Sequence, residues 1–173
     1  MYLKLFRKEG RYMITADLLK QFAFFKGFSE GELSKLAEIA TEESFKAGFQ
    51  VYKKGDPASK LYLLQEGKVV MLMDSYMGPH RPPMQVTVDL VTKGEAMGWS
   101  AVVDPYLYTL GARCIDDSKA IIFDAEKLRN LLNKDNALGY KFTQAVAKVI
   151  ATRLTHTQII LVGERGLSVL TEY

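Results

Sequence analysis

Apolar residues near the start of the chain recur at helical spacing, which predicts two short helices. Residues 15–26 form the first, with Thr15 as its N-cap, Gly27 as its end, and an apolar face made of Leu18, Leu19, Phe22 and Phe25. Ser29 begins the second helix, and Glu32 three residues later has the spacing of a capping box. We therefore expect a small helical layer before the rest of the chain.

From about residue 42 the helical spacing gives way to short apolar runs broken by turn residues. The turn at Glu66-Gly67 predicts that the strands before and after it pair as a hairpin. Short strands at this spacing are typical of a sandwich or barrel, and we expect them at 49–53, 61–65, 68–73, 85–90, 109–114 and 119–123.

The last part of the chain returns to helical spacing. Asp124 is placed to cap a helix over 125–133, and residues 136–162 predict one long helix of roughly 40 Å. Its apolar stripe repeats every three or four residues, at Phe142, Val146, Ile150, Leu154 and Leu161. A helix this long extends beyond a small barrel, so part of the stripe either packs on a second copy of the chain or lies flat on its own barrel. We expect the first arrangement, a homodimer through 136–162.

Together these elements predict an α+β protein that is mainly β. The expected organisation is an N-terminal arm at 1–14, one domain at 15–162 whose β-rich core spans about 43–123, and a C-terminal tail at 163–173. A length of 173 residues with 48% apolar residues agrees with one domain that buries its own core.

Composition and charge narrow the class of protein. The single cysteine, Cys114, excludes an internal disulfide and agrees with a reducing cytoplasm. No stretch has the length and apolar character that we would expect of a membrane span, and residues 1–11 lack the apolar run of a signal peptide. The net charge of +3 comes without a concentrated basic patch. We expect a cytoplasmic protein that binds neither DNA nor a membrane.

Residues suited to catalysis or metal binding are sparse. The two histidines, His80 and His156, lie in a proline-rich loop and on the long helix, outside any cluster with metal-ligand spacing. No nucleophile–base motif is present. Cys114 has the features of a buried apolar residue on a strand. We expect no enzyme activity, no catalytic residue and no metal site.

One short segment, 94–102, has the features of an anion-binding turn. Gly94 allows close approach to the backbone, and a helix over Glu95–Val102 would leave its first amides, at Ala96 and Met97, free to bind an anion. Glu95 is suited to accept hydrogen bonds from ligand hydroxyls. The alternative is an ordinary turn before a helix.

Three segments together resemble the cyclic nucleotide-binding domain family. They are LKQFAFFKGFSEGELSKL at 19–36, KAGFQVYKKGDPASKLYLLQEGKVVMLMD at 46–74 and GEAMGWSAV at 94–102. Over residues 15–162 the chain is similar to the effector domain of Crp/Fnr-type regulators. The resemblance implies a double-stranded β-helix, a jelly-roll-like β-roll, with N-terminal helices and a long C-terminal helix. Only 163–173 follow that helix, so we expect a stand-alone member without a helix-turn-helix.

The resemblance also implies a ligand site for cAMP or cGMP. Glu95 would bind the ribose 2′-hydroxyl, and the amides of Ala96 and Met97 would face the cyclic phosphate. The arginine with which the family pairs the phosphate falls on a tyrosine here. The remaining candidate ligand residues are Gly94, Tyr106, Tyr108, Thr109, Thr157 and Gln158.

The missing arginine leaves alternatives open. The two tyrosines either stack on a flat ring or simply fill the pocket, and Arg113 further along the strand is the nearest replacement. The function that we expect is a small-molecule-sensing module that signals to a downstream protein through the dimer helix. The alternatives are a degenerate dimeric scaffold that binds no nucleotide, and a Crp/Fnr-like transcription regulator lacking its DNA-binding domain.

Overall fold

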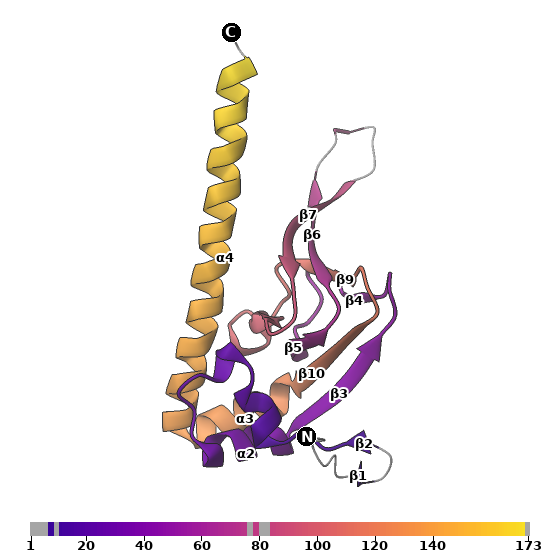
Figure 1. Cartoon of the computed structure of the whole chain (residues 1–173). Helices are drawn as coiled ribbons and strands as arrows, with labels where there is room; N and C mark the ends of the chain where they lie inside the picture. Colours follow the sequence, from indigo (N-terminus) through magenta and orange to yellow (C-terminus); the bar gives the residue numbers. More distant parts are fainter. Residues whose placement is uncertain (1–6, 9–10, 76–77, 80–83, 172–173) are drawn as a thin grey trace.

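The computed structural model describes residues 7–8, 11–75, 78–79 and 84–171. Its centre is a roll of two antiparallel sheets, with the N-terminal helices and α3 (Ala125–Lys134) at the base and the long helix α4 (Asn136–Thr171) alongside (Figure 1). The expected β-roll with flanking helices is confirmed.

Two four-stranded sheets make up the roll within the described residues. One has the order β3–β10–β5–β8, with strands at Ala40–Phe45, Ser118–Asp124, Lys60–Glu66 and Ala96–Met97. The other has the order β4–β9–β6–β7, with strands at Gln50–Tyr52, Gly111–Cys114, Val69–Ser75 and Met84–Val91. A separate small hairpin pairs β1 (Arg7–Lys8) with β2 (Arg11–Tyr12).

The chain changes sheet at Gly67, so the expected hairpin about Glu66-Gly67 is wrong. β5 pairs with β10 and β8, whereas β6 pairs with β7 and β9. Gly67 has a positive φ of 85°, and a Cβ there would lie 2.3 Å from the Ser118 Oγ atom. Glycine therefore lets the chain cross tightly over the start of β10 and enter the second sheet.

The N-terminal helical layer is shorter and more broken than expected. α1 (Ala16–Lys20) is capped by the Thr15 side chain, but Phe22 is extended and the chain continues as the 3₁₀ turn η1 (Ala23–Phe25). The break turns Phe24 and Phe25 into the core, where they meet Phe142 and Phe123 edge to face. Aromatic packing has replaced the single helical face that the spacing of residues 15–26 predicted.

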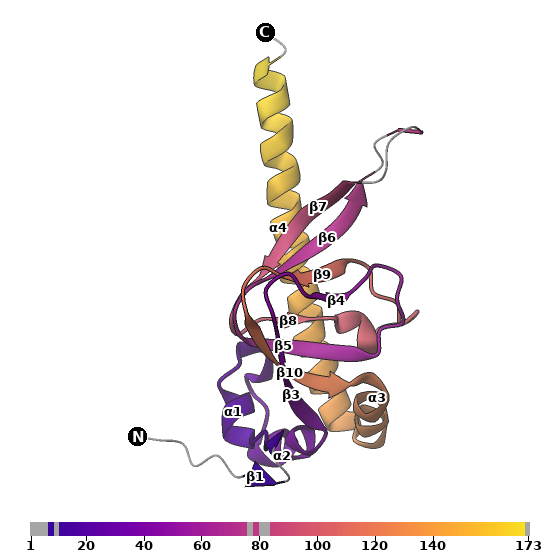
Figure 2. The same cartoon turned by 90° about the vertical axis from the view of Figure 1, so that its right-hand side faces the viewer.

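α4 begins in the core and ends outside it. Leu138, Phe142, Ala145 and Val146 are buried, while Leu154 and Ile159 are 57% and 65% exposed. Figures 1 and 2 show the helix rising along the roll and past it. The helix continues beyond residue 162 as far as Thr171, so most of the expected C-terminal tail is helical.

Contrary to the sequence-based expectation, α4 has the length and composition of a membrane span between Asn136 and Val162. That property alone is weak evidence, because core helices of globular proteins share it. In this chain the first part of the segment packs against the β-roll and η1.

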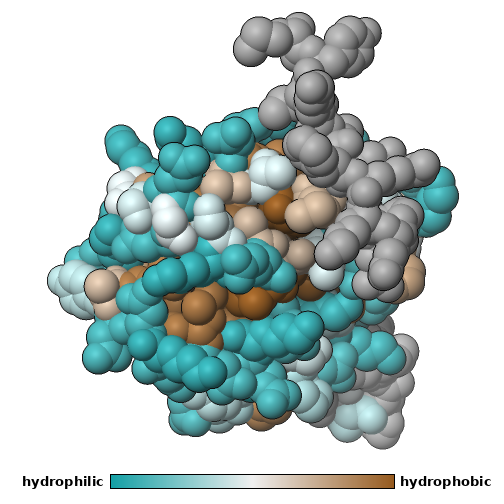
Figure 3. Space-filling model, turned by 90° about the horizontal axis from the view of Figure 1, so that it is seen from below, coloured by the Kyte–Doolittle hydropathy of each residue, from teal (hydrophilic) through white to brown (hydrophobic). Residues whose placement is uncertain are grey.

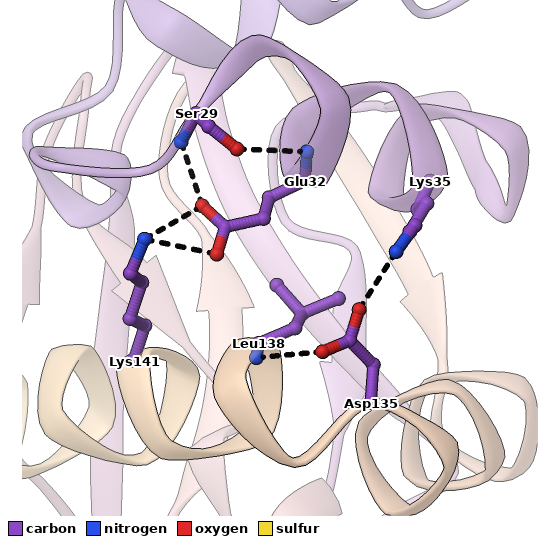
Figure 4. A network of polar contacts seen from close by, with 6 residues as sticks. All are labelled: Ser29, Glu32, Lys35, Asp135, Leu138 and Lys141. Atoms are coloured by element: carbon purple, nitrogen blue, oxygen red, sulfur yellow. Dashed lines mark hydrogen bonds and ion pairs between the residues drawn. The ribbon is translucent and has the colours of Figure 1, made fainter.

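Polar contacts fix the base of α4 to the N-terminal layer (Figure 4). α2 (Glu30–Glu38) starts with a capping box in which Ser29 Oγ accepts from the Glu32 amide and Glu32 Oε2 accepts from the Ser29 amide. The ammonium of Lys141 reaches the same carboxylate at 2.9 Å. The Ser29 amide and Lys141 together lower the pKa of Glu32.

A second ion pair joins α2 to the residue immediately before α4. Lys35 Nζ lies 2.7 Å from Asp135 Oδ2, and the other carboxylate oxygen accepts from the Leu138 amide. Lys35 and that amide lower the pKa of Asp135. The underside of the molecule is mostly hydrophilic, with bands of hydrophobic atoms between the polar side chains (Figure 3). Buried aromatics and surface ion pairs thus hold the same end of α4.

Candidate functional site

Two of the hollows beside α4 together contain most of the sequence-predicted site. The inner cavity, of about 230 Å³, lies between the roll and α4, and its lining includes Met97, Gly98, Trp99, Ser100, Tyr108 and Thr109. The basic groove, of about 490 Å³, lies between η1, the 94–96 turn and α4. Its polar lining includes Lys26, Glu95, Lys141, Lys148, Arg153 and His156. Arg153 lines both hollows.

The turn before β8 places Glu95 on the wall of the basic groove. The Gly94 amide donates to the Leu64 carbonyl at 2.8 Å, and the Leu64 amide donates to the Glu95 carbonyl at 2.9 Å. The Glu95 carboxylate turns back and accepts from the Thr92 amide at 2.6 Å and the Thr92 hydroxyl at 2.8 Å. The carboxylate of Glu95 is thus held by hydrogen bonds within its own turn. Its role as a ribose ligand remains a prediction.

The helix expected over Glu95–Val102 is not formed as such. Ala96 and Met97 form β8, which pairs with β5, and the 3₁₀ turn η2 (Trp99–Val102) starts only after them. In an antiparallel ladder, hydrogen-bonded and non-bonded residue pairs alternate. Because the Leu64 amide is bonded to the Glu95 carbonyl, the Ala96 amide faces away from β5 and the Met97 amide faces toward it. The segment forms a strand because Ala96 and Met97 complete the sheet edge beside the buried β5.

Gly98 lies where β8 ends and the inner cavity begins. It adopts a left-handed conformation with φ of 74°, and a Cβ would approach the Lys60 carbonyl oxygen to 2.9 Å. The Tyr108 ring lies on another side, 3.3 Å from the same Cβ position. Glycine is therefore required for the backbone to pass between β5 and this ring.

Tyr108, at one of the two positions matched to the family's arginine, is part of the cavity wall. Its ring stacks on Tyr52 with centroids 3.7 Å apart. Its hydroxyl donates to the Lys60 carbonyl at 2.8 Å and accepts from the Lys60 amide at 3.1 Å. Burial raises the pKa of Tyr108, so the phenol is neutral at physiological pH. Of the two expected uses of this tyrosine, the geometry favours filling the pocket.

The structure separates Tyr106 from Tyr108. Tyr106 is 40% exposed and lies under the guanidinium of Arg129, which is 4.5 Å from the ring centroid. It lines a different hollow, between η2, α3 and the start of α4. Only one of the two tyrosines therefore belongs to the inner cavity.

Of the remaining predicted residues, some line the inner cavity and others lie outside it. Thr109 and Thr157 line the inner cavity, whereas Gln158 is exposed and lines neither that cavity nor the basic groove. Arg113 lies on β9 between Ala112 and Cys114, both of which are buried in the core. Strand alternation directs Arg113 to the opposite face, so it does not reach the cavity.

The charged residue that sequence reasoning missed is Arg153. Its side chain is 17% exposed, and its guanidinium pairs with Asp89 and donates to the Ala96 carbonyl at 3.1 Å. Burial lowers the pKa of Arg153, although a guanidinium stays protonated in proteins. One signal was available, because Arg153 falls on the apolar stripe of the long helix, three residues after Ile150.

Among the described residues, no group of three or more His, Cys, Asp or Glu side chains is placed to hold a metal ion. Cys114 is buried, and burial raises the pKa of its thiol. The inner cavity offers hydrogen-bonding groups, aromatic rings and the half-buried guanidinium of Arg153.

The fold is a β-roll with a cavity between the roll and a C-terminal helix, and the mouth of such a roll is a common place for a ligand site. The family model described as "Cyclic nucleotide-binding domain" matches residues 42–135. The chain belongs to this family.

Similar proteins extend the match over most of the chain. A crystal structure of a putative cyclic nucleotide-binding protein from Geobacter metallireducens GS-15 shares 30% identity with a TM-score of 0.73, covering 82% of this chain and 99% of that one. A CRP-like cAMP-activated global transcriptional regulator of Mycobacterium tuberculosis is 22% identical over 82% of this chain. A putative potassium channel protein of Rhodopseudomonas palustris is 18% identical over 91% of this chain. The chain spans 59% of the regulator's length and 37% of the channel protein's.

Proposed function

We propose that this chain is a regulatory domain that binds a cyclic nucleotide or a similar small phosphate-bearing molecule in the inner cavity. The observation that carries the proposal is the position of that cavity, whose lining comes from both the roll and α4. A ligand there touches both parts at once, so its binding energy depends on how α4 is docked. Family membership supports a ligand of the nucleotide class.

In this proposal cAMP and cGMP are the first ligands to test. Met97, Thr109 and Thr157 contribute from the cavity wall, and Glu95 is the candidate for the ribose hydroxyl. A tyrosine, Tyr106 or Tyr108, falls where the family has an arginine, and a charge-assisted bond to phosphate is worth about 1.5–3 kcal/mol. We therefore expect binding about 10- to 100-fold weaker than that of a site with the arginine.

The output of the domain is assigned to the outer part of α4. Among the described side chains beyond Arg153, Leu154, Ile159, Ile160, Leu161 and Val162 are half or more exposed. Apolar residues at this density on a projecting helix favour a second copy of the same helix as the partner. A homodimer in the cytoplasm, acting on a downstream protein rather than as a catalyst, completes the proposal.

Isothermal titration calorimetry with cAMP and cGMP tests this function. We expect saturable binding in the micromolar range and a rise in the thermal unfolding temperature with ligand concentration. Absence of both heat and thermal shift with either nucleotide would remove the cyclic nucleotide from the proposal.

One observation favours a second candidate, a dimeric scaffold that binds no nucleotide. The Tyr108 hydroxyl donates to and accepts from the backbone of Lys60, so this side chain offers a ligand little. Tyr108→Arg separates the two readings of the site. A gain in cAMP affinity supports a working nucleotide site, whereas a folded variant without any affinity supports the scaffold.

A further inference from the structure

Arg153 connects α4 to both sheets of the roll. One guanidinium nitrogen pairs with Asp89 on β7, and the other donates to the Ala96 carbonyl on β8 at 3.1 Å. The Asp89 side chain is only 19% exposed, and its second oxygen accepts from the Leu90 amide at 2.8 Å. This is a sheltered ion pair, in which loss of either partner leaves a poorly solvated charge.

The same side chain is part of the wall of both hollows. Among the described residues lining the inner cavity, Arg153 is the one with a charged side chain. In the basic groove it stands beside Lys148 and His156, with Lys26 and Lys141 further along the lining. Glu95 also lines the groove, and Lys141 and Arg153 are paired with Glu32 and Asp89. The cationic side chains still outnumber the carboxylates, and this balance favours binding of an anion.

The size of the inner cavity makes the pairing of Arg153 important. Its volume of about 230 Å³ is below the roughly 300–1,000 Å³ typical of small-molecule sites. The neighbouring groove is larger, at about 490 Å³, and Arg153 belongs to both walls. Arg153 therefore stands between the two spaces, and its position bears on whether a ligand can use both.

We infer that Arg153 is the anion-binding residue of this domain, replacing from α4 the cation that Tyr108 does not supply, and that Asp89 competes with the ligand for it. The inference rests on the proposed function. It implies that the ligand carries a negatively charged phosphate group. This group would contact α4 directly, because Arg153 is a residue of that helix.

The chemistry of the guanidinium supports this exchange of partners. A guanidinium presents a planar fork of N–H donors that matches the oxygens of phosphate as well as those of a carboxylate. In this structure only one Asp89 oxygen faces Arg153, because the other is bonded to the Leu90 amide. A phosphate in the cavity offers two free oxygens to the same fork. Release of Asp89 then loosens α4 from β7, so binding and the position of the helix change together.

Substitution of the two partners gives opposite predictions, which calorimetry with cAMP and cGMP measures. Arg153→Gln is expected to weaken binding about 10- to 100-fold, because a charge-assisted contact to phosphate is lost. Arg153→Lys is expected to fall between it and the wild type. Asp89→Asn is expected to bind about tenfold more tightly, because the competing carboxylate is gone. Arg113→Gln, on the outer face of β9, is the matched control and should bind as the wild type does.

Hydrogen–deuterium exchange over residues 150–157 provides a second measurement. Asp89→Asn should raise exchange there without ligand, and cAMP should raise it in the wild type. If Arg153→Gln does not fold, Asp89→Asn still decides, because it leaves Arg153 in place. Wild-type binding that Arg153→Gln leaves unchanged, or Asp89→Asn binding that is no tighter, overturns this inference and leaves the proposed function standing. A wild type that binds neither nucleotide removes both.

Discussion

The two halves of α4 have different environments. As far as Ile150, side chains of the helix pack on the roll and on η1, and ion pairs fix its base to α2. Arg153 is hydrogen-bonded to the roll, and from Leu154 to Val162 the described side chains are exposed although many of them are apolar. The same apolar stripe is therefore buried against the roll in the first half and exposed in the second.

This difference shows why helical periodicity alone does not identify a partner. Phe142 and Ile160 have the same kind of apolar side chain on the same helix, yet the first is fully buried and the second is 51% exposed. The distinction arises from the length of the roll, which ends before the helix does (Figure 2). The boundary between the halves lies at Arg153, next to the proposed ligand site.

The largest effect is expected in the packed half. Phe142→Ala removes a fully buried ring that contacts Phe24, and should lower the free energy of unfolding by about 3–5 kcal/mol. Urea denaturation followed by circular dichroism measures this change. Tyr140→Ala is the control on the same half, since that ring is 68% exposed, and should change stability by no more than about 0.5 kcal/mol. Equal effects of the two variants would contradict the packing described for α4.

A smaller effect, and of another kind, is expected in the outer half. The double variant Ile159→Ser/Ile160→Ser removes two exposed apolar side chains and should weaken the proposed dimer by about 3 kcal/mol, roughly a hundredfold in Kd. Analytical ultracentrifugation over a concentration series measures the Kd. Thr155→Ala, at another exposed position, should leave it unchanged. A monomeric wild type at high concentration would rule out this use of the helix.

The smallest effect concerns the ion pairs at the base and depends on pH. The pKa of Glu32 is lower in the folded chain than its ordinary value, through the Ser29 amide and Lys141. Its contribution to stability is therefore present above the ordinary carboxyl pKa of about 4.3 and is lost as the pH falls through the folded pKa. Glu32→Gln should lower the free energy of unfolding at pH 7. It should also reduce the fall in that free energy that the wild type shows below about pH 4.3. Urea denaturation as a function of pH measures both.

Glu38→Gln, an exposed position on the same helix, is the control for that pH series. Its curve should follow that of the wild type. If Glu32→Gln also follows the wild type at every pH, the contact shown in Figure 4 contributes nothing to the docking of α4.

Much of the local structure could be predicted from the sequence. The caps at Thr15, Ser29 and Asp124 form as expected, because a cap depends on residues within one turn of it. The strand predictions also agree, to within a few residues at each end, with the six strands β4, β5, β6, β7, β9 and β10. The alternation of apolar and polar residues and the turns that flank them predict a strand. They do so without information on which strand it pairs with.

Pairing and side-chain environment were not predictable in this way. The turn at Gly67 has the residues of a hairpin, but contact with Ser118, far along the chain, directs it into a crossover. The Gly94–Val102 segment has the composition of a helix start, but β5 supplies a sheet edge for Ala96 and Met97. In both places a long-range contact prevails over a local preference, because burial against a neighbour outweighs intrinsic propensity.

The sequence by itself determined the family, the order of most of the helices and strands, and the loss of the arginine at the phosphate position. Only the tertiary structure decided which side chains surround the cavity, and it is the basis for proposing Arg153 as the replacement. Tyr108 stacks on Tyr52 inside the roll, and Arg153 pairs with Asp89 across a separation of 64 residues. The physical reason is that a helical stripe defines a face but not the surface that it meets, so a cation on that face acquires its partner only when α4 docks on the roll.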